Sequence, residues 1–454
     1  MAGDTTKDMT QGSPMKLILG FSIPLLFGFL FQQFYNVMDT IIVGRVLGVN
    51  ALAGVGSTGS LNFLIIGFCM GVCNGFAIPL AHKFGAKDYS GMRRFIANGM
   101  WLSILFSAVM TIATAVFCRE MLMAMKTPDD IFSYAYSYIF IIFLGIPATY
   151  LYNMLSGIIR AMGDSKTPLV FLTLSSFLNI ALDLVCIISL HMGVAGAAVA
   201  TVVSQAVSGV FCLIYMIKKF PLLRMEKEEW KINIQYMKTL CGMGIPMGLQ
   251  YSITAIGSVI LQSAVNGIGS DAVAAVTAGS KLSMLMVCPF DAMGSTMATY
   301  GGQNMGAGKL DRLDKGLKAC TVLGLLYSFV AIGVIFAAGR QLLFLFLDAG
   351  EVAIIENSYY YICRNALFYF PLALINIIRF LIQGMGFGKL AVFAGAFEML
   401  ARGLAGFILV PFFGFSAVCY ANPLAWVFAD LFLIPAFFYV RRKVAAIMGQ
   451  KSKK

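Results

Sequence analysis

The chain has 454 residues, of which 59% are hydrophobic and only 12% are charged. Soluble domains are about 45–50% apolar and about 25% charged, so this composition excludes a soluble enzyme, a disordered chain and a nucleic-acid-binding domain. The formal net charge is +12, from 33 Lys and Arg against 21 Asp and Glu. We therefore expect a membrane protein without a nucleic-acid partner.

Twelve stretches are long and apolar enough to cross a bilayer, which takes about 20 mostly apolar residues in a helix. In chain order they cover residues 16–44, 52–80, 95–118, 131–156, 168–190, 194–218, 238–264, 272–300, 316–339, 354–382, 389–411 and 415–440. These long runs lack the alternation of short membrane β-strands. The sequence therefore predicts an all-α integral membrane protein with twelve transmembrane helices.

Lys and Arg are distributed unevenly between the connections that join these helices. The connections on one predicted side hold most of them, whereas those on the other side hold only Arg45, Arg119, Lys126 and Arg340. Connections rich in Lys and Arg stay in the cytoplasm and contact anionic lipid headgroups. We therefore expect a multi-pass protein with both termini in the cytoplasm.

The two halves of the chain repeat each other. Gly20–Pro24 aligns with Gly242–Pro246, 222 residues later, and 160–163 aligns with 383–386 in the same way. Each half has six helices, an even number, so both halves insert the same way up, as in transporters built from parallel repeats. The sequence predicts two pseudo-symmetric six-helix bundles, residues 1–222 and 238–454, joined by a cytoplasmic linker at 223–237.

Two acidic residues interrupt apolar helices of the first half. Asn36 and Asp39 lie on one polar stripe of the first helix, and Asn179 and Asp183 lie on one stripe of the fifth. Ionisable groups at bilayer depth are costly and by default mark ion or substrate paths. Carboxylates with amide neighbours can hold a proton or coordinate Na⁺ through oxygen atoms. We interpret both acids as functional; the alternative is that each only hydrogen-bonds to a neighbouring helix.

Pro24 lies inside the first helix, where a proline removes one backbone hydrogen bond and permits a kink. The kink is either static or responds to the protonation of Asp39. In the second half, Asp291 is the best candidate for an acid that faces a cation. Glu398 and Arg402 lie four residues apart and can pair, either lining a cavity or forming a neutralised structural bridge.

These features resemble the multidrug and toxic compound extrusion (MATE) family of cation-coupled antiporters, within the multidrug/oligosaccharidyl-lipid/polysaccharide flippase superfamily. The resemblance covers nearly the whole chain and is most specific in Pro24, fifteen residues before Asp39, and in Asn179-x-x-x-Asp183. It implies that Asp39, Asn179, Asp183 and Thr201 form the cation-coupling site, with Na⁺ or a proton held by the first three.

Within that family, the sequence looks most like the DinF-like branch. Gln33, Tyr138 and Asn153 match cavity positions of its first bundle. The NorM-like branch places acids in the seventh and tenth helices, where this chain has only Glu356 near the outer end of the tenth. The residues expected to line the substrate cavity are Gln33, Asn36, Tyr138, Asn153, Asp291, Glu398 and Arg402.

The resemblance implies a secondary active antiporter of the bacterial plasma membrane. It would export amphipathic or cationic organic compounds in exchange for H⁺ or Na⁺, as a monomer without a cofactor. A flippase for a lipid-linked cell-envelope precursor stays open because of Arg364, Arg379 and Arg402, and a passive channel is a further alternative. No enzyme is expected, since the chain has only two histidines and no catalytic constellation.

Overall fold

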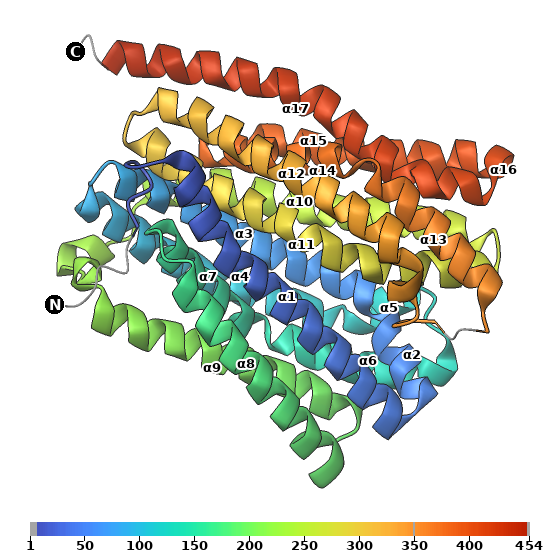
Figure 1. The fold of residues 1–454 in the computed structure, drawn as a ribbon. Helices are drawn as coiled ribbons and strands as arrows, with labels where there is room; N and C mark the ends of the chain where they lie inside the picture. Colours follow the sequence, from blue (N-terminus) through green and yellow to red (C-terminus); the bar gives the residue numbers. More distant parts are fainter. Residues whose placement is uncertain (1–6, 348–349, 452–454) are drawn as a thin grey trace. The chain divides into compact units, whose positions relative to one another are not determined.

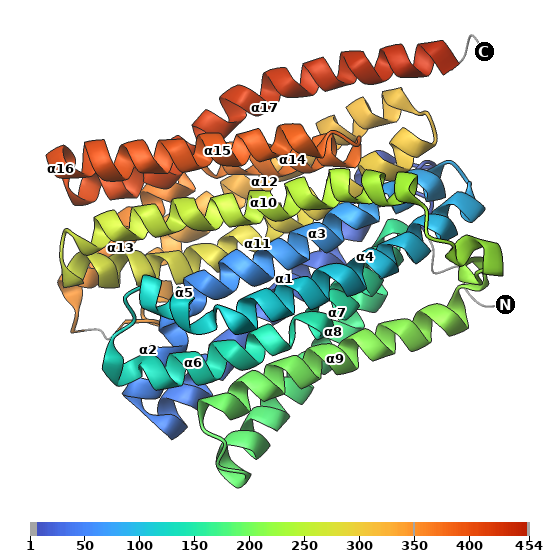
Figure 2. The same ribbon diagram turned by 180° about the vertical axis from the view of Figure 1, so that it is seen from behind.

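The computed structural model describes residues 7–347 and 350–451, and all of the regular structure in those ranges is helical. The first half holds α1 (Pro14–Leu47), α2 (Val49–Ser57), α3 (Gly59–Gly85), α4 (Tyr89–Val116), α5 (Cys118–Ala124), α6 (Asp129–Leu144), α7 (Ile146–Ala161), α8 (Lys166–Leu184) and α9 (Val194–Lys219). The second half holds α10 (Ile234–Asn266), α11 (Ser270–Gly306), α12 (Leu310–Leu343), α13 (Val352–Ala366), α14 (Tyr369–Gly384), α15 (Gly388–Leu404), α16 (Val410–Phe413) and α17 (Phe415–Lys451). Figures 1 and 2 show these helices from opposite sides.

In the described part of the chain, ten helices are each long and apolar enough to cross a membrane. Two bent pairs, α6 with α7 and α13 with α14, bring the number to twelve if each pair is one span. The predicted all-α membrane fold is confirmed.

The prediction of unbroken helices at 131–156 and 354–382 is wrong. The axes of α6 and α7 differ by 47° across Gly145, and those of α13 and α14 differ by 50°. A proline follows each break, Pro147 in α7 and Pro371 in α14. Proline has no N–H to donate to the preceding turn, so the α-helical ladder cannot continue through either position.

A short π-helical turn follows α8 at Val185–Ser189, and another follows α15 at Ala405–Leu409. Such turns insert an extra residue into the helical ladder and are frequent at functional sites. Both lie directly after helices that carry charged residues of the predicted sites, Asp183 in α8 and Arg402 in α15.

The described residues form two compact units. The first contains Phe27–Gly248 with Lys7 and Asp8, and the second contains Met9–Leu26 and the chain from Leu249 onward. Both α1 and α10 therefore divide between the units, two residues after Pro24 and Pro246 respectively. The division of the chain at 222 and 238 describes the sequence repeat and stays a prediction.

In the first unit, α8 packs beside α9, and α7 contacts both α3 and α9. The start of α10 lies very close to α3, because a Cβ atom added to Gly75 would come 2.5 Å from the Cα of Gly244. Glycines allow such close approach between membrane helices.

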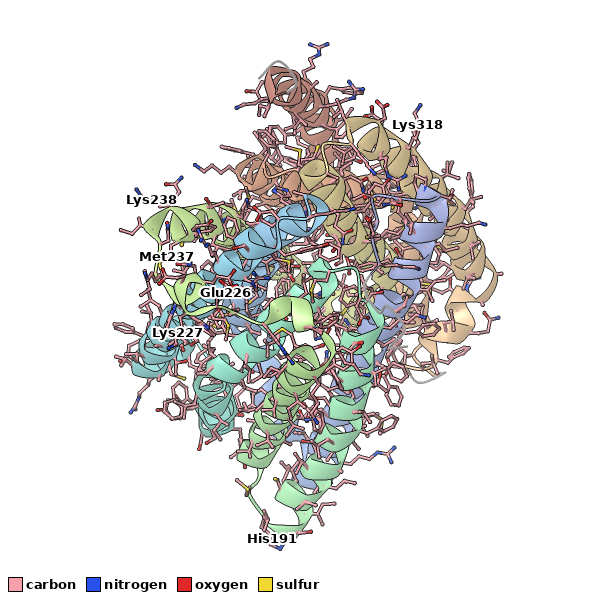
Figure 3. The ribbon with its side chains drawn as sticks, turned by 90° about the vertical axis from the view of Figure 1, so that its left-hand side faces the viewer. His191, Glu226, Lys227, Met237, Lys238 and Lys318 are labelled. Carbon is pink, nitrogen blue, oxygen red and sulfur yellow. The ribbon has the colours of Figure 1, made fainter. Side chains whose placement is uncertain are left out.

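The linker between the repeats is anchored on α4. The N–H of Asn233 donates to Oδ1 of Asn98 at 2.8 Å, and Nε1 of Trp101 donates to the carbonyl of Trp230 at 3.4 Å. Figure 3 shows Glu226 and Lys227 of this linker far from His191, which lies at the other end of α9. The linker is therefore a folded part of the first unit.

In the second unit, α11 packs against α14, and α15 packs against α17. The residues that precede α1 are held on α11 and α12. The N–H of Met9 donates to Oε1 of Gln303 at 2.8 Å, and Nη2 of Arg312 donates to the carbonyl of Met9 at 3.0 Å. Lys309 holds the next carbonyl, that of Thr10, at 2.8 Å.

Candidate functional site

The first unit brings two buried acids together. Asp39, in α1, is 8% exposed, and Asp183, in α8, is fully buried. The two carboxylates are close enough to interact electrostatically. Oδ1 of Asp39 and both carboxylate oxygens of Asp183 have no hydrogen-bond partner among the described residues. Buried acceptors without donors are unfavourable, so these oxygens are suited to a cation or a proton.

Asn179 and Thr201 add an amide and a hydroxyl to this arrangement. Asn179 lies one turn before Asp183 in α8 and is buried. Its Nδ2 donates to Oγ1 of Thr201, in α9, at 3.4 Å, while its Oδ1 finds no donor in the described chain. The amide is thereby oriented with its oxygen free. Within the described ranges, no three His, Cys, Asp or Glu side chains gather to hold a metal ion, so any ion here would bind to two carboxylates and amide or hydroxyl oxygens.

Two tyrosines lie near the acids. Tyr138, in α6, is 8% exposed and is close enough to interact electrostatically with both Asp39 and Asp183. Tyr35 interacts with the same two residues and was missed in the sequence. Its position four residues before Asp39 in α1 places both on one helix face, which is the signal that identifies it.

The other predicted residues of the first bundle lie apart from this pairing. Asn153 is buried in α7 and donates to the carbonyl of Thr149 at 2.8 Å. Thr149 in turn donates to Oε1 of Gln205, in α9, at 2.9 Å. In α1, Gln33 is partly buried and Asn36 is exposed.

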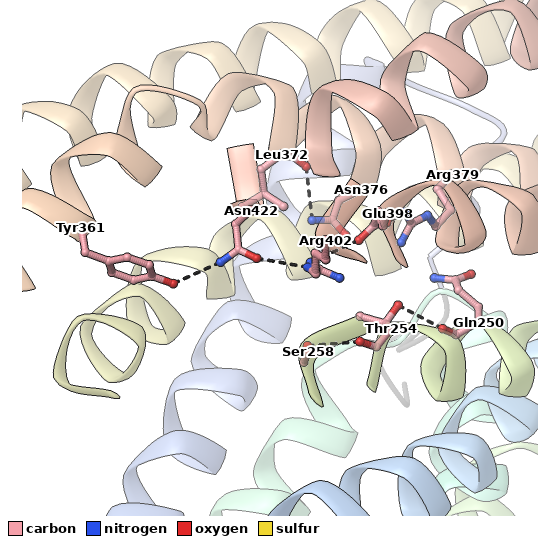
Figure 4. Close-up of polar contacts among 10 residues, drawn as sticks. All are labelled: Gln250, Thr254, Ser258, Tyr361, Leu372, Asn376, Arg379, Glu398, Arg402 and Asn422. Carbon is pink, nitrogen blue, oxygen red and sulfur yellow. Dashed lines mark hydrogen bonds and ion pairs between the residues drawn. The ribbon is translucent and has the colours of Figure 1, made fainter. Parts of the chain in front are cut away.

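The second unit holds a buried network of charges, shown in Figure 4. Arg379 and Arg402 both pair with Glu398, the first through Oε1 and the second through Oε2 at 3.5 Å. Arg402 also donates from Nε to Oδ1 of Asn422 at 3.1 Å, and Asn422 donates to the hydroxyl of Tyr361 at 3.1 Å. The predicted pairing of Glu398 with Arg402 is present. The sequence missed Asn422 and Tyr361, since neither carries a charge.

Further polar groups surround this network. Gln383 donates from Nε2 to Oε1 of Gln250, in α10, at 2.5 Å. Asp430, in α17, is 7% exposed, and Asp291, in α11, is exposed. Both acids interact electrostatically with Arg379, which lies inside α14 rather than at its end. The structure thus places Asp291 near the arginines and not near a second acid pair.

The family model described as MatE matches the chain twice, at residues 24–185 and 246–408. The two matches begin 222 residues apart and end 223 residues apart, which confirms the sequence repeat. Together they cover more than half of the chain.

Curated relatives are membrane exporters by name. The chain is 29% identical over 376 residues to "Probable multidrug resistance protein YpnP" of Bacillus subtilis, with 82% of each chain covered. It is 28% identical over 359 residues to "Probable multidrug resistance protein YoeA" of the same organism, with 78% of each covered.

The fold is also that of solved transporters. One is described as the outward-facing conformation of a multidrug resistance MATE family transporter of the MOP superfamily. It is 23% identical, with a TM-score of 0.89 over 98% of this chain and 100% of the other. The chain therefore belongs to the MatE family of multi-pass membrane transporters.

Proposed function

We propose that this protein exports amphipathic or cationic organic compounds in exchange for H⁺ or Na⁺ by alternating access. The names of its relatives support multidrug efflux. The observation that carries the coupling part is the pair of buried acids, Asp39 and Asp183, whose oxygens lack donors among the described residues. Ionisable groups at this depth are retained where they bind or move an ion.

The cycle couples the two ligands through their different affinities for the two states of the transporter. An external cation neutralises Asp39 and Asp183, with Asn179 and Thr201 as further ligands, and this changes the packing of α1. Pro24 weakens the helix two residues before it passes from one unit to the other. The change lowers the affinity for the drug in the outward-open state, so the drug leaves outside. Drug and cation must prefer different states for coupling to occur.

The remaining assignments belong to the same proposal. The protein lies in a bacterial plasma membrane with both termini in the cytoplasm, contacts lipid and acts as a monomer without a cofactor. The polar residues Gln33, Asn36, Tyr138 and Asn153 of the first repeat, and Asp291, Glu398 and Arg402 of the second, line the path of the substrate.

Efflux from proteoliposomes tests the proposal. A fluorescent organic cation is loaded, and pH and Na⁺ gradients are imposed separately. We expect uphill efflux under at least one gradient and none without a gradient. Downhill leakage that ignores both gradients would identify a passive channel and reject antiport.

A flippase for a lipid-linked cell-envelope precursor is a second candidate. The buried arginines Arg379 and Arg402 favour it, because a pyrophosphate headgroup needs cationic donors. The two functions are separated by comparing drug-susceptibility profiles with complementation of a flippase-deficient strain. Complementation without a change in drug susceptibility would favour the flippase.

A further inference from the structure

Two guanidinium groups share a single carboxylate in the second unit. Arg379 and Arg402 both pair with Glu398, and no other acid in the described chain forms an ion pair with either of them. The side chains of all three are less than a tenth exposed. Paired charges inside a membrane protein are expected to neutralise one another. Here one positive charge exceeds what the shared carboxylate can balance.

Several donors of these arginines are also unused. Nε of Arg379 and Nη1 of Arg402 are buried and have no acceptor among the described residues. A guanidinium group has five N–H donors and is the preferred partner for a planar, bidentate carboxylate. The network therefore presents buried, charged donors that a ligand can satisfy.

Acceptors without donors lie in the same region. Oδ1 of Asp430 and Oε1 of Gln383 are buried and find no donor in the described ranges. Asp430 interacts electrostatically with Arg379 and Glu398, and Asp291 interacts with Arg379, but neither aspartate forms an ion pair there. Donors and acceptors thus remain unpaired side by side, which fits a ligand that carries both kinds of charge.

The guanidinium group of Arg402 is held in place. Asn422 accepts from its Nε at 3.1 Å and is itself fixed by the hydroxyl of Tyr361 (Figure 4). On the side of α10, Gly257 lets the group lie against the helix, since a Cβ atom there would come 3.4 Å from Nη1. Binding groups that are fixed before the ligand arrives lose less entropy on binding.

The repeat gives this network a counterpart of opposite charge. By the 222-residue offset α15 corresponds to α8, and α13 corresponds to α6. In the first unit these helices carry Asp183 and Tyr138, and in the second they carry Arg402 and Tyr361. The same position in the fold thus presents an acid in one unit and a guanidinium in the other.

We propose that Arg379 and Arg402 bind the carboxylate of zwitterionic amphipathic substrates, with Asp430 beside the cationic part of the same molecule. This inference rests on the proposed export of organic compounds and names a substrate class for it. Glu398 then acts as a positioning residue that holds both arginines and is not itself the group that the substrate contacts.

Two dyes with the same ring system test the proposal. Rhodamine 110 carries a carboxylate and a cationic ring, and rhodamine 123 is its methyl ester and carries only the cation. Binding to the purified full-length protein is followed by fluorescence polarisation. We expect Arg402→Lys to weaken binding of rhodamine 110 about tenfold, because lysine cannot offer paired planar donors, and to change binding of the ester less than about twofold.

Arg340→Lys is the matched control, because Arg340 also pairs with a glutamate, Glu356, but at an exposed position of the same unit. It should change neither affinity. Gly257→Ala keeps all charges and adds a methyl group beside Nη1 of Arg402, so it should weaken rhodamine 110 selectively even if Arg402→Lys folds poorly. Equal losses for both dyes in the folded variants, or no loss, would show a purely structural bridge and overturn the proposal.

The outcomes also separate this inference from the proposed function. Gradient-driven export of rhodamine 123 by proteoliposomes, with no binding of rhodamine 110, would reject the carboxylate site alone. Selective binding of rhodamine 110 without driven export of either dye would support the site and reject the proposed antiport.

Discussion

Nε of Arg93, in α4, donates to Oε2 of Glu229, in the linker between the repeats, at 2.6 Å. Ser90 donates to the other carboxylate oxygen at 2.9 Å, so both oxygens of this buried glutamate are satisfied by α4. The Arg93 guanidinium lowers the pKa of Glu229 from its usual 4.5 to about 2. The linker is thus held by an interaction that requires a charged carboxylate.

Glu229→Gln should lower the stability of the protein at pH 7 by about 2 kcal/mol, because a charge-assisted hydrogen bond is lost. A carboxyl group with a depressed folded-state pKa stabilises the fold above its unfolded pKa and loses that contribution as the pH falls. The difference between wild type and variant should therefore be constant above about pH 5 and shrink between pH 4.5 and pH 2. Thermal unfolding in detergent, followed with a thiol-reactive dye, measures it, since nine of the ten cysteines are buried.

Glu228→Gln is the control for this prediction. Glu228 lies in the same short helix and pairs with Lys231, but both side chains are 69% exposed. Exposed pairs contribute little, so this variant should unfold like wild type at every pH. A pH-independent difference for Glu229→Gln would contradict the assigned role of the charge.

Asp39→Asn should insert normally and lose cation-driven efflux. The amide keeps the size of the side chain but cannot release a proton or offer a charged ligand to a cation. Transport is measured in proteoliposomes under imposed gradients, with Asp130→Asn, an exposed acid at the start of α6, as the control. Wild-type efflux by Asp39→Asn would rule out the coupling site.

Thr201→Val should distinguish the coupling ions. Valine keeps the shape of threonine but removes the hydroxyl that Asn179 contacts at 3.4 Å. Hard cations such as Na⁺ need several oxygen ligands, whereas a proton needs only a carboxylate. We expect Na⁺-driven efflux to require a severalfold higher Na⁺ concentration, with H⁺-driven efflux unchanged. A comparable loss under both gradients would indicate a packing role for Thr201.

Gly244→Ala should destabilise the first unit by about 1–3 kcal/mol through overpacking. A Cβ atom at Gly244 would come 2.5 Å from Cε1 of Phe76, in α3. Gly242, two residues earlier in α10, has no heavy atom of the described chain within 4 Å of its added Cβ. Gly242→Ala is therefore the matched control and should unfold at the temperature of wild type. Equal unfolding temperatures for the two variants would refute the close packing of α3 and α10.

Sequence alone predicted the class of fold well, because a bilayer imposes the length and apolarity of every span. It failed where a span breaks, since the bends at Gly145 and before Tyr369 lie inside runs that stay apolar throughout. Apolarity reports that a residue avoids water and says nothing about the direction of the helix axis.

The candidate site shows the same division. Asp39, Asn179 and Asp183 were identified because polar atoms inside apolar helices are conspicuous. Tyr35 and Tyr361 were not, because an aromatic ring in a membrane helix attracts no notice until its hydroxyl is placed beside a charge. The sharing of Glu398 by two arginines also depends on two helices, α14 and α15, and no spacing within one of them reveals it.

The division of α1 and α10 between the compact units bears on how such a chain could have arisen. A cut in the linker would leave Met9–Leu26 on a fragment other than the one with which they pack, and would likewise separate Ile234–Gly248 from α3. The duplicated gene therefore encodes the equivalent of a domain-swapped dimer fused into one polypeptide, in which each copy donates the opening half of its first helix. Neither half, produced alone, would contain all of the segments that its own core requires.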